Sequence, residues 1–202
     1  MNEIFRRPAY FPPRPGTTRS GDGLPRRKWS VYDLQKMLEA GIIQSGERFE
    51  LIGGDLVAMA AKGQHHELLK IALNFYWTRA CTPALMVAQE TPLRLDEFHE
   101  PEPEFIVYPR SIKPHDVRGD TVLLVVEVAD SSLGHDLNYK APIYASFGVR
   151  EYWVINAVRR ITTLHREPRP DGYASRLELS GSDRLVPSLA PELAVRLDDL
   201  EL

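Results

Sequence analysis

The sequence predicts a mixed α/β fold (α/β or α+β), in which helices flank a mixed central sheet. Residues 122–128 are apolar at nearly every position, which is typical of a central strand that helices cover on both faces. Helical and strand-like hydrophobic periods also follow one another along the chain. The chain has 202 residues, a length within the range of one compact domain.

Residues 1–28 differ in composition from the rest of the chain. They lack a sustained apolar period and hold seven basic residues against two acidic ones, together with five of the sixteen prolines. This composition predicts a flexible basic arm, followed by a single domain over residues 29–202. Such an arm can neutralise phosphates. A solvated leader, or an arm that packs on a partner subunit, explains the same composition equally well.

The first elements of the domain have clear start and stop signals. Ser30 is a suitable N-cap for a helix, and Gly41 ends that helix by accepting a left-handed conformation. In residues 48–59, two short β-prone runs meet at Gly53-Gly54, which predicts a hairpin with a type I′ turn. A second helix is expected over residues 65–80. Its broad apolar face is predicted to hold Leu68, Leu69, Ala72, Leu73, Phe75 and Tyr76.

The remaining elements alternate around the apolar strand. A helix is expected to end near Gly148, and the segment after residue 160 is expected to form peripheral β structure. The predicted strands are residues 85–94, 105–108, 122–128, 151–155, 160–165 and 172–179.

Bulk composition excludes several classes of protein. The formal net charge is only −3, so any nucleic-acid binding has to be local. The single cysteine, Cys81, excludes an intramolecular disulfide framework and a cysteine-rich zinc site. No apolar run approaches the roughly 20 residues that cross a membrane, and the N-terminus has no signal-peptide pattern. We therefore expect a cytoplasmic protein without a membrane partner.

Two acidic residues stand out against the predicted strands. Strand alternation places Glu127 among aliphatic residues, where an unpaired carboxylate is costly. Such a group is protonated, paired or bound to a cation. Glu104 begins a neighbouring strand, where it can share one ion with Glu127, because Mg²⁺ prefers carboxylates and water. The alternative is a buried Glu127 paired with a core arginine or lysine.

A lysine follows in the next segment. Lys140 is a candidate for stabilising negative charge on a phosphate, although a lone helix lysine is more often a solvated charge. In a continuous helix, Asp136, Lys140 and Tyr144 share one face. Pro142 argues against such a helix, so either a helix starts near Lys140 or the helix kinks.

Two further candidates come from the N-terminal half. Glu50 is a possible third acid facing the site, although exposed strand glutamates are common. His65 and His66 open the second helix, where backbone donors favour an anion. Either they help to hold a phosphate, or one of them caps the helix.

Several of these segments together resemble the Uma-type family of restriction-endonuclease-like proteins, within the PD-(D/E)xK nuclease superfamily. The segments are RFELIGGDLVAM, HHELL, PEFIVY, LLVVEVADSS, the spacing of Asp136, Lys140 and Tyr144, and GVREYWVIN. The resemblance covers about residues 29–200.

The resemblance implies an αβββαβ core and metal-dependent cleavage of DNA, with Mg²⁺ or Mn²⁺ as cofactor. Its aspartate position matches Glu104, its strand acid matches Glu127, and its lysine matches Lys140 on the following helix. Glu50 and His65 match further family positions. Ala129 stands where the superfamily's usual lysine would be, and Glu104 is one methylene longer than the usual aspartate.

Three functions remain open at this point. The first is an Mg²⁺- or Mn²⁺-dependent endonuclease in which Glu104 and Glu127 hold the ion. The second is an inactive nuclease-like module that binds nucleic acid or a protein partner. The third, a carboxylate-pair hydrolase acting on sugars, is poor because nothing in the sequence indicates a sugar platform. Nucleases that cut both strands are often dimers, so a homodimer is compatible with the first function.

Overall fold

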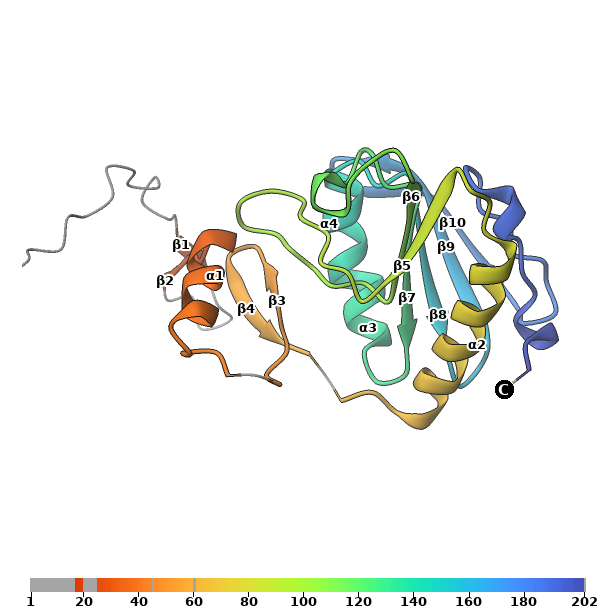
Figure 1. Cartoon of the computed structure of the whole chain (residues 1–202), viewed down its shortest axis with the longest axis horizontal. Helices are drawn as coiled ribbons and strands as arrows, with labels where there is room; N and C mark the ends of the chain where they lie inside the picture. Colours follow the sequence, from red (N-terminus) through yellow and green to blue (C-terminus); the bar gives the residue numbers. More distant parts are fainter. Residues whose placement is uncertain (1–16, 20–24, 45, 60, 202) are drawn as a thin grey trace, which may run out of the picture. The chain divides into compact units, whose positions relative to one another are not determined.

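The computed structural model describes residues 17–19, 25–44, 46–59 and 61–201 (Figure 1). The chain divides into two compact units. The N-terminal unit runs to Ala58 and also includes Asp96–His99, and the sheet-bearing unit holds Met59–Leu95 and Glu100–Leu202. The prediction of a single domain over residues 29–202 stays a prediction.

The N-terminal unit contains the first predicted helix and hairpin. Strands β1 (Thr17–Arg19) and β2 (Pro25–Arg27) pair antiparallel. Most of the rest of the predicted flexible arm lies outside the described residues.

The cap and turn signals of this unit are confirmed. Helix α1 (Val31–Glu39) begins after Ser30, whose side chain forms a capping box with Asp33. Strands β3 (Phe49–Ile52) and β4 (Asp55–Ala58) form the predicted hairpin. Gly53 and Gly54 have φ angles of 64° and 88°, the positive values that a type I′ turn requires.

The sheet-bearing unit is built on six strands in the order β10-β9-β8-β7-β6-β5. Only β7 and β8 pair in parallel, so the mixed sheet predicted from the sequence is confirmed. The strands are β5 (Leu85–Gln89), β6 (Phe105–Pro109), β7 (Leu124–Ala129), β8 (Glu151–Asn156), β9 (Ile161–Arg169) and β10 (Gly172–Leu179). Three short 3₁₀ turns lie outside the sheet: Pro114–Asp116, Pro191–Leu193 and Leu197–Asp199.

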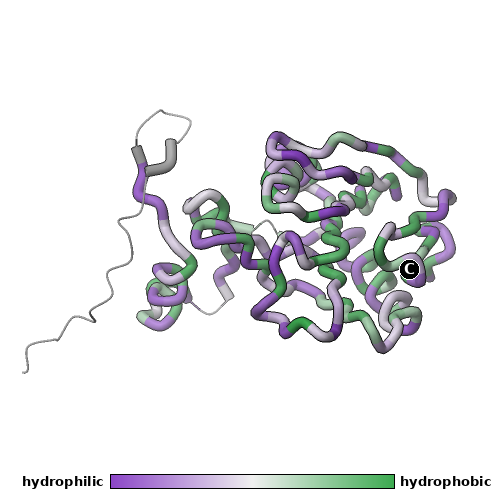
Figure 2. The backbone as a smooth tube through the Cα atoms, turned by 90° about the horizontal axis from the view of Figure 1, so that it is seen from above, coloured by the Kyte–Doolittle hydropathy of each residue, from purple (hydrophilic) through white to green (hydrophobic). Residues whose placement is uncertain are grey.

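Helices cover both faces of this sheet, as the continuous apolar run of β7 predicts (Figure 1). Helix α2 (Gln64–Ala80) covers one face, where Trp77 packs edge-on against Phe105. The other face is covered by α3 (Leu133–His135), the π-helical turn η2 (Asp136–Lys140) and α4 (Ala141–Ser146). Hydrophobic stretches run through the interior of this unit (Figure 2).

Helix α2 buries a narrower face than its sequence predicts. Leu69, Ala72 and Leu73 are buried as expected, together with Trp77. In contrast, Leu68, Phe75 and Tyr76 are exposed, because the sheet contacts only one side of the helix. In the described part of the chain, no helix has both the length and the apolar content to cross a bilayer.

The end of α4 packs closely against the loop before β7. A Cβ atom added to the buried Gly119 lies 2.3 Å from the backbone oxygen of Phe147, so the backbone has to move. We expect Gly119→Ala to lower the free energy of unfolding by about 1–3 kcal/mol, measured by urea titration. The control is Gly134→Ala in α3, where a Cβ has no neighbour within 4 Å. Equal stability of the two variants would contradict this packing.

Candidate active site

Three glutamates lie in or next to three neighbouring strands of the sheet: Glu90 directly follows β5, Glu104 directly precedes β6, and Glu127 lies in β7. Strands β6 and β7 pair Phe105 with Val126, and the same register continued by one residue sets Glu104 opposite Glu127. On the other side, the backbone N–H of Glu90 donates to the carbonyl of Glu104 at 3.2 Å. We call Glu90, Glu104 and Glu127 the acidic row. Two of its members are the acids singled out in the sequence.

The side chains of these two acids have partners on different elements. Glu127 alternates with Val125 and Ala129, which belong to the core beneath α4. Glu104 directly precedes β6 and contacts His66 of α2 and Lys62. The continued register sets the backbones of the two predicted metal-binding residues opposite each other.

Glu127 is buried in the middle of β7 and has a lysine partner. Its side chain is 5% exposed, and its Oε1 atom accepts hydrogen bonds from Lys140 Nζ at 3.0 Å and from the Tyr144 hydroxyl at 3.3 Å. The Lys140 ammonium also lies 3.8 Å from Asp136 Oδ1. The two acids, one lysine and one phenol thus satisfy one another in a region that excludes water.

A π-helical turn delivers Lys140 to Glu127. Within η2 the backbone N–H of Ala141 bonds to the carbonyl of Asp136, five residues back, as in a π-helix. Asp136 and Lys140, the first and last residues of this turn, are both buried. Ser132 Oγ holds the Asp136 carboxylate at 2.7 Å. Pro142 lies in the first turn of α4. Residues 133–146 are helical without a break, and Lys140 and Ala141 both have helical φ and ψ angles, so Pro142 lies within one helical run that a π turn interrupts and not at a new helix start.

Aromatic rings support this part of the site. Tyr144 packs on Tyr152 with ring centroids 4.8 Å apart, and the Tyr152 hydroxyl donates to the carbonyl of Asp136 at 3.2 Å. Complete burial, and then the nearby Glu127 charge, raise the pKa of Tyr152 well above its usual value. Tyr152 therefore stays a neutral hydrogen-bond donor that fixes the η2 turn.

Glu104 is surrounded by cationic and imidazole groups from the start of α2. Its Oε1 atom lies 3.0 Å from His66 Nε2 and 3.0 Å from Lys62 Nζ. Burial alone would raise the pKa of Glu104, but the bonds from His66 and Lys62 outweigh burial and lower it. Glu104 is consequently ionised at neutral pH.

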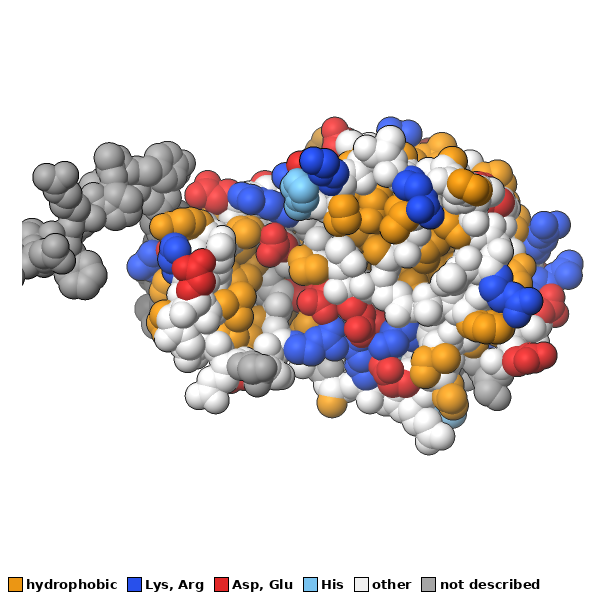
Figure 3. All heavy atoms as spheres, viewed as in Figure 1, with side chains coloured by type: hydrophobic (Ala, Val, Ile, Leu, Met, Phe, Trp, Pro, Cys, Tyr) orange, Lys and Arg blue, Asp and Glu red, His pale blue; other side chains and the backbone are white. Residues whose placement is uncertain are grey.

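Glu90 completes the row and shares these lysines. It adopts a left-handed backbone conformation, with φ 46°, and pairs with both Lys62 and Lys70. The bond from Lys62 is the largest influence; with the bond from Lys70 it outweighs burial and lowers the pKa of Glu90 to about 2. Lys70 also bonds to Glu67 at 2.9 Å. Figure 3 shows acidic and basic side chains gathered next to one another on one face of the molecule.

Sequence reasoning missed three members of this group: Lys62, Lys70 and Glu90. One signal was available, because His66 and Lys70 are four residues apart and so share a face of α2. Of the two histidines named from the sequence, the structure places His66 beside Glu104, while His65 is exposed. Glu50 is buried on β3 in the N-terminal unit, and its role at the site stays a prediction.

The donor atoms of the acidic row fit a hard cation. Among the described residues, no three His, Cys, Asp or Glu side chains are grouped as a metal cage made by protein alone. Mg²⁺ does not need such a cage, because it is usually held by one or two carboxylates and keeps several waters. Glu104 and Glu127 supply two carboxylates, so the residues present fit Mg²⁺ by donor type.

The low pKa of Glu90 has a consequence for acid stability. A carboxylate whose pKa is depressed by folding stabilises the protein fully above its ordinary pKa of 4.5, and this stabilisation is lost as pH falls toward about 2. We expect Glu90→Gln to be less stable at neutral pH and to lose less stability across that acidic window. Urea unfolding between pH 7 and pH 2 measures both effects.

The matched control is Glu178→Gln, which removes an exposed carboxylate on β10 that pairs with an arginine. It should retain the steep acid loss of the wild-type protein. If Glu90→Gln loses stability with the same slope as wild type, the bridge from Glu90 to the two lysines is not the cause.

Comparison with known proteins agrees with this fold. A crystal structure described as a putative nuclease belonging to DUF820, from Anabaena variabilis ATCC 29413, superposes with a TM-score of 0.64 at 13% identity. The superposition covers 84% of this chain and 96% of the other, which shows a shared nuclease-like fold. No curated protein matches. The profile of the Uma2 family, described as "Putative restriction endonuclease", matches residues 31–198, so the chain belongs to the Uma2 family.

Proposed function

We propose that this protein is an endonuclease that hydrolyses DNA phosphodiester bonds with Mg²⁺ or Mn²⁺ as cofactor. One observation carries the proposal: in a chain of a nuclease family, the buried Glu127 is bonded to Lys140, and the β6–β7 register continued by one residue sets Glu104 opposite Glu127. Two acids beside a lysine are the groups that metal-dependent phosphodiester hydrolysis needs.

Glu104 and Glu127 are the residues that would hold the cation. When bound, it would lower the pKa of a coordinated water and polarise the phosphate. Contacts from His66 and Lys62 keep Glu104 ionised, which is the form that binds metal. Asp136 and Tyr144 hold Lys140 and Glu127 in place and act as positioning residues.

Carboxylates and ammonium groups alternate through the two paired groups of the site. The carboxylates belong to Glu67, Glu90, Glu104, Glu127 and Asp136, and the ammonium groups to Lys62, Lys70 and Lys140.

Lys140 is the proposed electrostatic catalyst. Its ammonium is held between Glu127 and Asp136, and its 5% exposure limits competition from water. A positive charge fixed in this way stabilises negative charge that develops on a phosphate. Glu50 and His65 remain candidate auxiliary residues, the second because it lies in the first turn of α2, where an anion is favoured.

A second candidate is a nuclease-like module that binds nucleic acid or a protein without cutting. A specific observation favours it: each glutamate of the acidic row already has a lysine partner. Ala129, fully buried, also occupies the usual lysine position on β7. In this candidate the lysines have a structural role only.

Cleavage of supercoiled plasmid by the full-length protein distinguishes the two. With Mg²⁺ or Mn²⁺ we expect nicked and linear products, and none in excess chelator. Glu127→Gln and Lys140→Met should each reduce the cleavage rate about 100-fold or more, because the first removes a carboxylate that would hold the cation and the second removes the positive charge that stabilises the transition state. Agarose-gel time courses measure the rates.

Two controls separate chemistry from folding. Glu178→Gln should cleave like wild type, and circular dichroism should confirm that every variant is folded. Lys140→Arg keeps the positive charge, so it should lose less activity than Lys140→Met. Cleavage at the wild-type rate by folded Glu127→Gln would refute the assigned site. A folded wild-type protein that binds Mn²⁺ but cuts no nucleic acid would favour the second candidate.

A further inference from the structure

Helix α2 carries an exposed apolar stripe on the side away from the sheet. Ile71 is 60% exposed and Phe75 is 63% exposed, and the half-exposed Leu68 precedes them by one turn. Residues three and four apart are neighbours on a helix surface, so the three side chains form one continuous stripe. Figure 3 shows hydrophobic side chains on the surface over this helix. Contiguous exposed apolar surface of this kind marks an interaction site.

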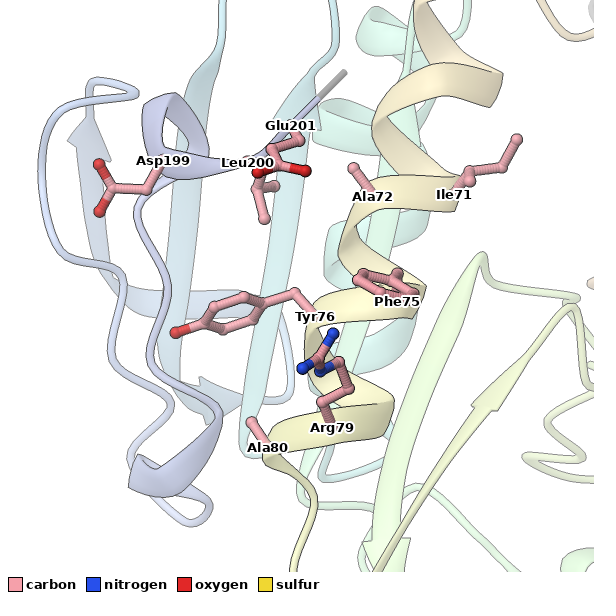
Figure 4. A pocket seen from close by; sticks show the side chains of 9 residues that line it. All are labelled: Ile71, Ala72, Phe75, Tyr76, Arg79, Ala80, Asp199, Leu200 and Glu201. Atoms are coloured by element: carbon pink, nitrogen blue, oxygen red, sulfur yellow. The ribbon is translucent and has the colours of Figure 1, made fainter.

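The stripe borders a cavity of about 620 Å³ between α2 and the C-terminal segment (Figure 4). The α2 side is lined by Ile71, Ala72, Phe75, Tyr76, Arg79 and Ala80, and the other side by Asp199, Leu200 and Glu201. Tyr76 closes its inner end, because its hydroxyl donates to the carbonyl of Ala194. A concave surface thus lies next to the protruding ring of Phe75.

Opposite charges lie at different levels along this surface. Arg79 is near the C-terminal end of α2, with its guanidinium 5.1 Å from the centre of the Phe75 ring. In Figure 4, Glu201 lies instead at the level of Ala72, about two helical turns away from Arg79 along α2. An apolar centre therefore has a cation toward one end and a carboxylate toward the other.

We propose that a second copy of this chain occupies this surface and forms a two-fold symmetric dimer. In such an interface the same patch serves both subunits, so the patch has to complement itself. A two-fold axis at Phe75–Tyr76, perpendicular to α2, sets the two helices antiparallel. It then brings Arg79 of one copy to the level of Ala72 of the other, where Glu201 lies.

The same operation also matches the apolar residues by size. Phe75 meets Phe75 and Tyr76 of the second copy, a contact between aromatic rings that are strong anchors in interfaces. Ile71 meets the small Ala80, which leaves room for the larger side chain. The charges at the two ends therefore pair in the same register that packs Ile71 against the small Ala80.

This dimer would carry two candidate active sites at opposite ends of the helix pair. His66 and Lys70, which contact the acidic row, lie on the N-terminal half of the same helix. Antiparallel pairing separates the two N-terminal halves. The dimer does not depend on the proposed nuclease activity, and its test is independent of cleavage.

Sedimentation velocity of the full-length protein over a concentration series tests the interface. We expect a concentration-dependent monomer–dimer equilibrium, and at least about a tenfold higher dissociation constant for Phe75→Glu. Phe75 is exposed in the single chain, so this variant should stay folded. The matched control is Val158→Glu, which places the same charge at an exposed apolar residue (57% exposed) in the turn after β8.

A charge exchange tests the register. Arg79→Glu and Glu201→Arg should each raise the dissociation constant, and the double variant should restore it toward the wild-type value. A wild-type protein that stays monomeric at every concentration would overturn the proposal. So would a dimer that Phe75→Glu leaves unchanged. A double variant no tighter than the single variants would overturn the antiparallel arrangement.

Discussion

An unpaired carboxylate inside β7 would have a high free-energy cost. This constraint determines the arrangement of much of the surrounding structure. Glu127 lies in a strand that helices cover on both faces, so water cannot solvate its charge. A later segment of the chain therefore has to bring a cationic side chain to Glu127. The π-helical turn η2 does so by burying Lys140 and Asp136 together, and Pro142 lies just after that turn, where the regular α-helical hydrogen bonds are interrupted.

Much of this arrangement could be predicted from single residues in their local context. The cap at Ser30, the positive φ angles at Gly53 and Gly54, and the need of Glu127 for a partner all follow from local rules. The alignment of Glu104 with Glu127 was harder to predict, because it follows from the register between two strands separated by a loop. The buried ion-pair partner of Glu127 and the candidate catalytic lysine are the same residue, Lys140.

The rest of the site could not be predicted because it depends on tertiary packing. Glu90 joins the row only through its left-handed backbone and the β5–β6 register. His66 and Lys70 reach it because of the rotation of α2 about its own axis, which hydrophobic periodicity left undetermined. Because this rotation was undetermined, the sequence predicted Leu68 and Phe75 on the buried face of α2. Their exposure instead produces the stripe on which the proposed dimer rests.

The central claim is that the acidic row, held by its lysines, is a site for one divalent cation. Isothermal titration of the folded protein with Mn²⁺ tests it most directly, with Glu104→Gln, Glu127→Gln and the control Glu178→Gln measured beside the wild type. We expect one ion per chain, bound about tenfold or more weakly by each of the two site variants and unchanged in the control. Wild-type affinity in both site variants would contradict the account.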